Sequence, residues 1–366
     1  MGNSPHLNGK CSNPGYVKEG IGSCSRKSVT RRICWKSRSI LIDWIKGGKR
    51  HGIVWNGRSD CVVESCCVVG RLRLVPLLIG VLYLNERQII PEIPGRQLER
   101  IVPGISTAQL YLPDGNVVDL GKDSVCDLQL LEGGRFVNER GTLTYKGDSS
   151  EVKVAQYSEV RIPRGGEYKV VLPDGTIVWL NAESSLRFPT LFTGKERKVY
   201  AKGELYFDVK HDDTKPFIVE VEKDYSVRVL GTEFNLRAYS GFPVVTTLVE
   251  GRVQVRGVGN TVSLAPGQQA LEVSGTRDIK VLDVDVAPYV AWHEGKFYFV
   301  HAPLNSIMEE LARWYDVEVV FENPAVREEC FTIEMQRFDD FNKVLRLIER
   351  TGMVTISVDG HIVTVK

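Results

Sequence analysis

The sequence lacks the residue patterns on which most enzyme chemistry depends. Its six histidines are scattered, and none stands in the HExxH spacing of a zinc protease. There is no GxSxG nucleophile elbow and no GxxxxGK(S/T) phosphate loop, and the nearest approach to GxGxxG, at Gly257, lacks the third glycine. We therefore predict that the protein is not an enzyme and holds no metal and no cofactor.

Cysteine is sparse where folded domains are expected. Six of the eight cysteines precede residue 68 without forming a CxxC pair, and only Cys126 and Cys330 follow. Zinc ligation usually needs tighter, repeated spacing, so the early cysteines do not predict a metal site. The two later thiols are interpreted as small buried side chains, with a disulfide between them as the alternative in an oxidising compartment.

No hydrophobic run is long enough to cross a membrane by itself. The longest uninterrupted run, residues 74–84, is eleven residues, which is about 16 Å of helix, whereas a span needs roughly 20 residues. A spanning helix over residues 65–86 carries Arg71 and Arg73 near one end, where long side chains reach the lipid headgroups. We favour such a single span. A short buried helix and a late signal sequence are the alternatives.

The charge divides at the same place. Residues 1–74 contain 14 Lys and Arg against 4 Asp and Glu, which leaves a net charge of −9 for the remainder. Because a basic flank is retained in the cytoplasm, the N-terminus is predicted to lie inside and the bulk of the chain outside. Three tryptophans stand among the basic residues, but no helix-turn-helix or zinc-finger spacing is present, and we predict no nucleic-acid binding.

Short alternating segments begin after a linker at residues 87–104 that is rich in Pro and Gly. In PFIVEVEKDYSVRVL, the apolar residues Phe217, Val219 and Val221 fall on one strand face and the glutamates between them on the other. Turn residues recur about every 8 to 12 positions as far as Val286. This spacing predicts a mainly antiparallel jelly-roll or β-solenoid-like fold.

One corner of this β region occurs twice. LPDGNVVDL, at 112–120, and LPDGTIVWL, at 172–180, share the Pro, Asp and Gly of a hairpin turn in which glycine takes a positive φ. The repetition suggests two β units, 105–165 and 166–286, that stack and cover each other's apolar surface. Two unrelated hairpins with a common turn remain the alternative.

Residues 290–366 show a third pattern. The strand-like KFYFV precedes a helix with Leu304, Ile307 and Leu311 on one stripe, and VEVVF follows as a strand. The order recurs with FTIEM, a helix over DDFNKVLRLIERTG and a closing hairpin through Asp359 and Gly360. We predict a small α+β domain in βαβ-βαββ order.

Several of these motifs together resemble one family. LPDGTIVWLNAESSLRFPTLFTGKERKVYAKGELYFDVKHDDTKPFIVEV, followed by VLGTEFNLRAY and TTLVEGRVQV, is similar to the FecR anti-sigma factors in the form common in Bacteroidetes. The segment with FYFVHAPLNSIMEELARWYDVEVVF resembles their C-terminal domain, which is similar to the short N-terminal domain of secretins and TonB-dependent receptors. The matching signature residues are Pro173, Asp174, Gly175, Trp179, Asn181, Gly203, Phe207, Pro216, Phe217, Gly231, Thr232, Phe234 and Gly251.

The resemblance implies a location and two partners. Such proteins cross the bacterial inner membrane once, hold an extracytoplasmic-function sigma factor in the cytoplasm and read the signalling domain of an outer-membrane TonB-dependent receptor in the periplasm. Residues 1–64, basic and Cys-rich, do not show the amphipathic helices with which the family usually holds the sigma factor. The alternative for the chain is a periplasmic ligand- or carbohydrate-binding β module without sigma regulation.

Two sets of residues are candidates for the relay. Receptor docking is assigned to the C-terminal domain, represented by Leu304, Ile307, Leu311 and Tyr315 on its first helix. The Gly231–Thr232 peptide is a candidate cleavage site by acyl transfer to the threonine hydroxyl, with an ordinary strand turn as the alternative.

Overall fold

The structure, a computed structural model, describes residues 101–366 except for 131–133, 148–155, 222–224, 274 and 277. The segments 1–64 and 65–86, and the linker up to residue 100, lie outside the described residues, so their predictions stay untested. The helices that the structure does describe are all too short or too polar to cross a membrane.

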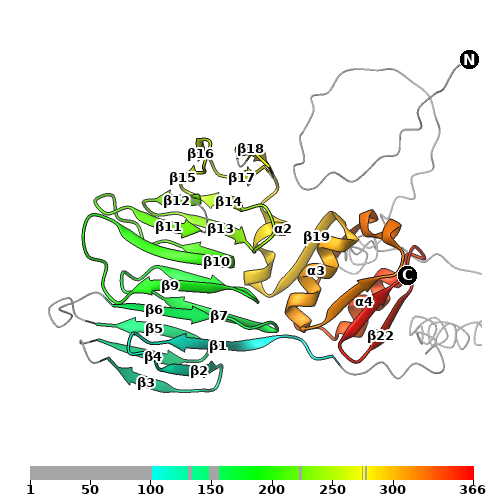
Figure 1. Cartoon of the computed structure of the whole chain (residues 1–366), viewed down its shortest axis with the longest axis horizontal. Helices are drawn as coiled ribbons and strands as arrows, with labels where there is room; N and C mark the ends of the chain where they lie inside the picture. The colour runs from blue at the N-terminus through cyan, green and yellow to red at the C-terminus, as the bar shows by residue number, and fades with distance from the viewer. Residues whose placement is uncertain (1–100, 131–133, 148–155, 222–224, 274, 277) are drawn as a thin grey trace, which may run out of the picture. The chain divides into compact units, whose positions relative to one another are not determined.

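Eighteen strands among the described residues form the β domain (Figure 1). In chain order they are β1 (Ile105–Tyr111), β2 (Val117–Gly121), β3 (Cys126–Gln129), β4 (Arg135–Glu139), β5 (Thr142–Lys146), β6 (Tyr157–Arg161), β7 (Gly166–Val171), β8 (Ile177–Leu180), β9 (Ser185–Pro189), β10 (Arg197–Asp208), β11 (Phe217–Val221), β12 (Tyr225–Val229), β13 (Glu233–Ala238), β14 (Val245–Glu250), β15 (Val253–Arg256), β16 (Thr261–Leu264), β17 (Gln268–Glu272) and β18 (Ile279–Asp283).

The strands lie in two layers. One layer has the order β2-β1-β6-β9-β10-β11-β12-β15-β16, and the other β3-β4-β5-β7-β8-β10-β13-β14-β17-β18. Their inner faces share one apolar core, in which Phe136 of β4 meets Phe188 of β9 with ring centroids 6.1 Å apart. The mainly β prediction is confirmed. Most pairs are antiparallel as expected, but β1–β7, β5–β7 and β10–β11 are parallel.

Strand β10 belongs to both layers, and a glycine makes this possible. Its first half pairs with β9 and β11, whereas its second half, from Gly203, pairs with β8 and β13. Gly203 has φ +82°, which L side chains rarely adopt, and a Cβ there would lie 2.7 Å from the carbonyl oxygen of Glu183. Only glycine therefore fits the corner at which the strand changes layers.

The two LPDG corners have the same geometry. In the β1–β2 hairpin, Leu112 N donates to Asn116 O at 2.9 Å, and in the β7–β8 hairpin Leu172 N donates to Thr176 O at 2.9 Å. The glycine of each corner has φ +89°. The aspartate of each corner accepts the backbone N–H two residues on, at 3.0 and 3.1 Å, as in an Asx turn.

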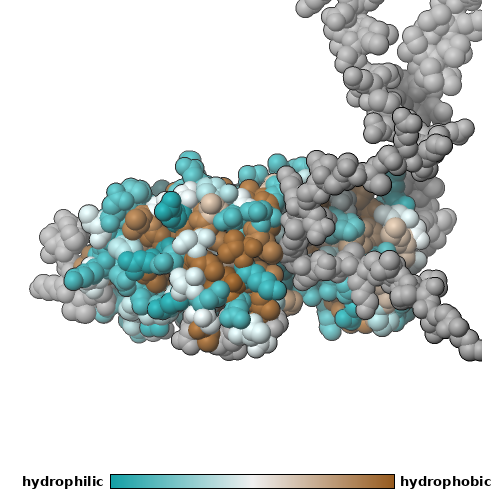
Figure 2. Space-filling view, turned by 90° about the horizontal axis from the view of Figure 1, so that it is seen from above, coloured by the Kyte–Doolittle hydropathy of each residue, from teal (hydrophilic) through white to brown (hydrophobic). Residues whose placement is uncertain are grey.

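Two short helical turns lead out of the β domain, α2 (Ala287–Val290) and η1 (Ala291–Glu294). None of the four residues of α2 is buried, although all but the tyrosine are purely apolar. Seen from above, apolar residues gather on this part of the β domain (Figure 2). The residues of α2 are therefore only partly covered, whereas Ala291 and Trp292 of η1 are buried.

The C-terminal domain follows the order expected from the sequence. Its elements are β19 (Lys296–Pro303), α3 (Leu304–Tyr315), β20 (Glu318–Phe321), η2 (Pro324–Glu328), β21 (Cys330–Gln336), α4 (Phe341–Glu349), β22 (Ile356–Asp359) and β23 (Ile362–Val365). β19 pairs with β21, and β23 lies between β20 and β22. Asp340 caps α4 by accepting from Asn342 N at 2.9 Å. The small α/β domain has its own core.

Gly203→Ala is expected to lower the free energy of unfolding by about 3 kcal/mol. About 1 kcal/mol comes from the left-handed backbone and the rest from the collision with Glu183 and Ser184. Gly194→Ala is the matched control, because Gly194 has φ +79° but nothing within 4 Å of a Cβ. It should cost only about 1 kcal/mol. Urea denaturation measures both values, and equal losses would contradict the corner assigned to Gly203.

Candidate functional site

A buried ring of polar side chains joins the β domain to the C-terminal domain. The carboxylate of Glu204 accepts hydrogen bonds from Asn181 Nδ2 at 2.9 Å and from Asn235 Nδ2 at 3.1 Å. The oxygens of these amides accept in turn from Arg337 Nη2 at 2.7 Å and from Trp292 Nε1 at 3.0 Å. Arg337 closes the ring by donating from Nη1 to the Trp292 carbonyl at 3.1 Å.

The members of the ring come from separate elements. Glu204 lies in β10, Asn181 after β8 and Asn235 in β13, whereas the tryptophan lies in η1 and Arg337 directly after β21. Glu204 is 4% exposed and Arg337 is 1% exposed. The guanidinium also lies 3.9 Å from the Trp314 ring centroid. Arg337 Nη1 also lies 3.7 Å from Glu167 Oε2 on β7, so the guanidinium faces a second carboxylate of the β domain. Removing one partner of a buried charged pair typically costs about 3–5 kcal/mol, so loss of Arg337 should weaken the register of the two domains.

More charged groups surround the ring. Arg237 Nη1 of the β domain lies 4.0 Å from Glu310 Oε2 on α3, and the Arg313 guanidinium lies 4.2 Å from the Tyr239 ring centroid. Burial raises the pKa of Glu310, and the neighbouring Glu204 carboxylate adds to the rise. The contact between the domains is thus polar and charged, unlike the two apolar cores on either side of it.

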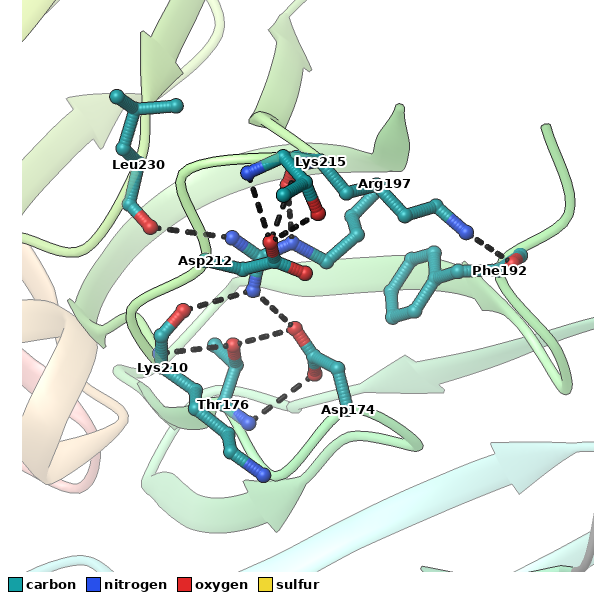
Figure 3. A network of polar contacts seen from close by, with 9 residues as sticks. Asp174, Thr176, Phe192, Arg197, Lys210, Asp212, Lys215 and Leu230 are labelled. Atoms are coloured by element: carbon teal, nitrogen blue, oxygen red, sulfur yellow. Dashed lines mark hydrogen bonds and ion pairs between the residues drawn. The ribbon is translucent and has the colours of Figure 1, made fainter. Parts of the chain in front are cut away.

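A second buried arginine, Arg197, gives the second LPDG corner a role that the first corner does not have. Arg197, 2% exposed, donates from Nη1 to Asp174 Oδ2 and to the Lys210 carbonyl, both at 2.8 Å (Figure 3). It also donates from Nε to the Lys215 carbonyl at 2.8 Å and from Nη2 to the Leu230 carbonyl at 3.2 Å. One side chain thereby fastens the second LPDG corner to the loop at 210–215 and to the end of β12.

The first corner has no such arginine. Asp114 is exposed, and the hydrogen bonds that the structure gives its side chain come from Asn116 alone. Asp174 binds Thr176, which is fully buried, as well as Arg197. One turn geometry therefore serves twice, once as a solvated hairpin and once as part of a buried network.

The candidate cleavage site, Gly231–Thr232, lies where several backbone segments pack closely together. A Cβ on Gly231 would lie 2.6 Å from the Cα of His211, and one on Gly251, which has φ +91°, would lie 2.9 Å from the Gly231 carbonyl oxygen. Thr232 is 5% exposed, and its hydroxyl donates to the Arg252 carbonyl at 3.1 Å. Close packing explains both glycines, and cleavage at Gly231–Thr232 stays a prediction.

The aromatic signature residues are structural. Phe207 and Phe234 stack with centroids 4.9 Å apart, and Phe217 lies 6.3 Å from Phe207, all fully buried. Trp179 is half-buried, and Lys169 Nζ lies 4.6 Å from its ring centroid. The Pro216 carbonyl accepts a hydrogen bond from the backbone N of Arg197 at 2.8 Å, so Pro216 lies beside the buried arginine.

The residues chosen to represent receptor docking lie inside the C-terminal domain. Leu304, Ile307 and Leu311 are 0% exposed and Tyr315 is 2% exposed, and all four belong to its apolar core. They cannot themselves touch a partner. Docking by this domain stays a prediction, and other residues would have to form the contact surface.

Asn181 is among the signature residues visible in the sequence, whereas no motif marks Glu204, Arg337 or Arg197. The sign of Glu204 appears only in the structure, where it stands in GELYF, a stretch of β10 with five successive buried residues. Such continuous burial indicates that both faces are covered, so a charge there requires a partner. Arg337 has no comparable sign, since it follows a strand in a polar segment.

Neither a metal site nor the expected alternative disulfide is found in the described part of the chain. No group of three or more His, Cys, Asp or Glu side chains is placed to hold an ion among the described residues. Cys126 is a free thiol, so it does not pair with Cys330, and the prediction that both side chains are buried is wrong, because both are partly exposed.

Comparison with known proteins identifies the family. The FecR protein family matches residues 158–254, and the FecR C-terminal family matches residues 296–365. Two crystal structures of a "putative anti-sigma factor" from Parabacteroides distasonis ATCC 8503, at 1.65 and 2.50 Å resolution, are 30% identical with a TM-score of 0.53. Each comparison covers 57% of this chain and 98% of that one. The chain belongs to the FecR family.

Membership of the FecR family confirms the resemblance seen in the sequence. FecR anti-sigma factors are regulators without enzymatic activity, in agreement with the prediction that the chain is not an enzyme. An anti-sigma factor acts on a sigma factor, which agrees with the first expected partner. No curated protein matches the chain.

Asp174→Ala should destabilise the protein by about 3 kcal/mol, because it leaves Arg197 buried without its carboxylate. Asp114→Ala, in the same turn geometry, should cost only about 1 kcal/mol, for the lost Asx hydrogen bonds. Urea denaturation of the two variants measures the difference. A similar cost at both corners would contradict the separate role of the second.

Glu310→Gln is expected to flatten the dependence of the melting temperature on pH. A carboxyl group whose folded-state pKa is raised stabilises the protein fully below its unfolded pKa of about 4.5, and this contribution is lost as the pH rises through the folded pKa. The melting temperature of wild type should therefore fall relative to that of the variant as the pH rises from 4.5. Glu328→Gln, at an exposed position, is the control. A wild-type to variant difference that stays constant with pH would contradict the assignment.

Proposed function

We propose that this FecR-family protein is a transmembrane anti-sigma factor that relays the state of an outer-membrane TonB-dependent receptor to an extracytoplasmic-function sigma factor. The N-terminus would lie in the cytoplasm and hold the sigma factor. The β domain and the C-terminal domain would lie in the periplasm and receive the receptor's signalling domain. The output would be the transcription of nutrient-uptake genes.

The observation that carries the proposal is the match of both folded domains to the family. The chain covers 98% of the related Parabacteroides structure, and the C-terminal family model matches the domain after residue 295. The division of charge about residue 74 agrees with a membrane between the basic beginning of the chain and its acidic remainder.

The buried ring supports a relay through the folded part. Docking changes a distant site only if it favours one of two states of the protein. Because Asn181 and Arg337 bond across the domain boundary, a partner that moves the C-terminal domain acts on the end of β8 and, through Glu204, on the interior of β10. A polar contact between domains also separates at lower cost than an apolar one, since water can replace its hydrogen bonds.

The aromatic residues weigh against the carbohydrate-binding alternative. A glycan groove needs exposed aromatic rings, but Trp292 is 4% exposed and Trp314 is 1% exposed, and both donate hydrogen bonds inside the protein. Trp179 lies against Tyr206 and below a lysine.

Affinity purification of the tagged full-length chain from membranes of its own cells tests the proposal. We expect a sigma factor and, after cross-linking, a TonB-dependent receptor among the recovered proteins. A chain truncated before residue 290 should keep the sigma factor and lose the receptor, whereas one that lacks residues 1–64 should lose the sigma factor. Retention of the full chain on a glycan column, with no sigma factor recovered, would favour the binding-module alternative.

A further inference from the structure

The segment before β1 contacts the C-terminal domain before it enters the β domain. Ile101 is 5% exposed and belongs to the core of the C-terminal domain, more than 180 residues further along the chain. Its neighbour Val102 is 64% exposed. We call residues 101–105 the connector, because they join the preceding part of the chain to β1.

The connector lies against α3 so closely that only glycine fits at its centre. A Cβ on Gly104 would lie 2.7 and 2.8 Å from ring atoms of Trp314 and 2.9 Å from the carbonyl oxygen of Gly165. Ile105 N donates to that same carbonyl at 2.9 Å, and Gly165 N donates to the Arg313 carbonyl at 2.8 Å. The connector, the β6–β7 turn and α3 therefore meet in a single contact.

Arg164 of the β6–β7 turn ties this contact to the end of α3. Its Nη2 donates to the carbonyls of Ala312 at 2.7 Å and Val317 at 2.8 Å, and its Nε donates to Asp316 Oδ1 at 2.9 Å. The Ala312 carbonyl also accepts from Asp316 N and Val317 N, so the arginine adds a hydrogen bond from the other domain to an end of α3 that its own chain already closes. The β domain caps the helix beside which the connector runs.

We infer that the C-terminal domain clamps the connector, and that movement of this domain away from the β domain releases it. The connector needs both partners at once, since Ile101 is buried in one domain and Ile105 is bonded to the other. Separation of the domains breaks the bond from Gly165 N to the Arg313 carbonyl and the contact of Gly104 with Trp314, without unfolding either core. The inference rests on the proposed function, because it identifies the element through which receptor docking would reach the sigma-factor side.

A cavity beside the connector leaves room for such movement. It has a volume of about 540 Å³ and is lined by the connector, the end of α3 and the β22–β23 turn at Gly360 and His361. The connector therefore lies along an open hollow rather than beneath further layers of protein. Val102 and Ile105 are each 64% exposed.

Hydrogen exchange of the full-length chain in detergent micelles, with Gly104→Ala, tests the clamp. The added methyl group pushes against Trp314, so peptides that contain the Gly165 amide, which donates across the boundary to Arg313, should exchange about tenfold faster while peptides of β10 and β13 stay unchanged. Val102→Ala removes an exposed side chain from the same segment and should leave exchange as in wild type. Arg164→Met removes the hydrogen bonds to the end of α3 without adding atoms to the connector, and it should give the same loss of protection. This second variant keeps the test decisive if Gly104→Ala fails to fold.

Transcript profiling separates this inference from the proposed function. The genes whose transcripts change when the gene for this protein is deleted define its regulon. Without any inducing substrate, Gly104→Ala and Arg164→Met should shift those transcripts at least about threefold from wild type, and Val102→Ala should not. Unchanged protection of Gly165 in both variants, or lost protection with wild-type transcripts, would overturn the clamp. A deletion that changes no sigma-dependent transcript would instead refute the proposed function.

Discussion

Opposite charges buried on either side of the domain boundary determine how this protein is assembled. Glu204 and Arg337 do not touch, because Asn181 lies between them and bonds to both. An amide can do this because it donates through its nitrogen and accepts through its oxygen. The hydrogen bonds to Glu204 come from Asn181 and Asn235 of its own domain, whereas Arg337 reaches Asn181 only when the two domains are docked. The two apolar cores can form separately, whereas the polar ring requires their correct docking.

The repeated LPDG corner shows how one local geometry acquires two uses. Both turns depend on the same residue types, with glycine at φ +89° and an aspartate that accepts the backbone two residues on. The surroundings of the two turns differ. Arg197 binds the second aspartate, Asp174, whereas the first, Asp114, is exposed to solvent. Repetition in the sequence therefore indicates a shared turn, and long-range contacts decide which copy becomes part of a buried network.

The sequence was sufficient for the local structure and insufficient for the contacts between elements. Period-two alternation predicted strands such as β11 and β12, and the 3.6-residue stripe predicted α3 and α4. The stripe on α3 also underlies the docking prediction, but a helix of a small domain needs its apolar stripe for the domain's own core. The ring escaped prediction because its members are up to 156 residues apart, and no local pattern relates Asn181 to Arg337.

The coupling free energy between Asn181 and Arg337 tests the account most directly. It is obtained from the unfolding free energies of wild type, Asn181→Ala, Arg337→Met and the double variant. A hydrogen-bonded pair in one buried network predicts a coupling of about 1–3 kcal/mol. Costs that add to within about 0.5 kcal/mol would show that the domains are not held together by this ring, and would contradict the account.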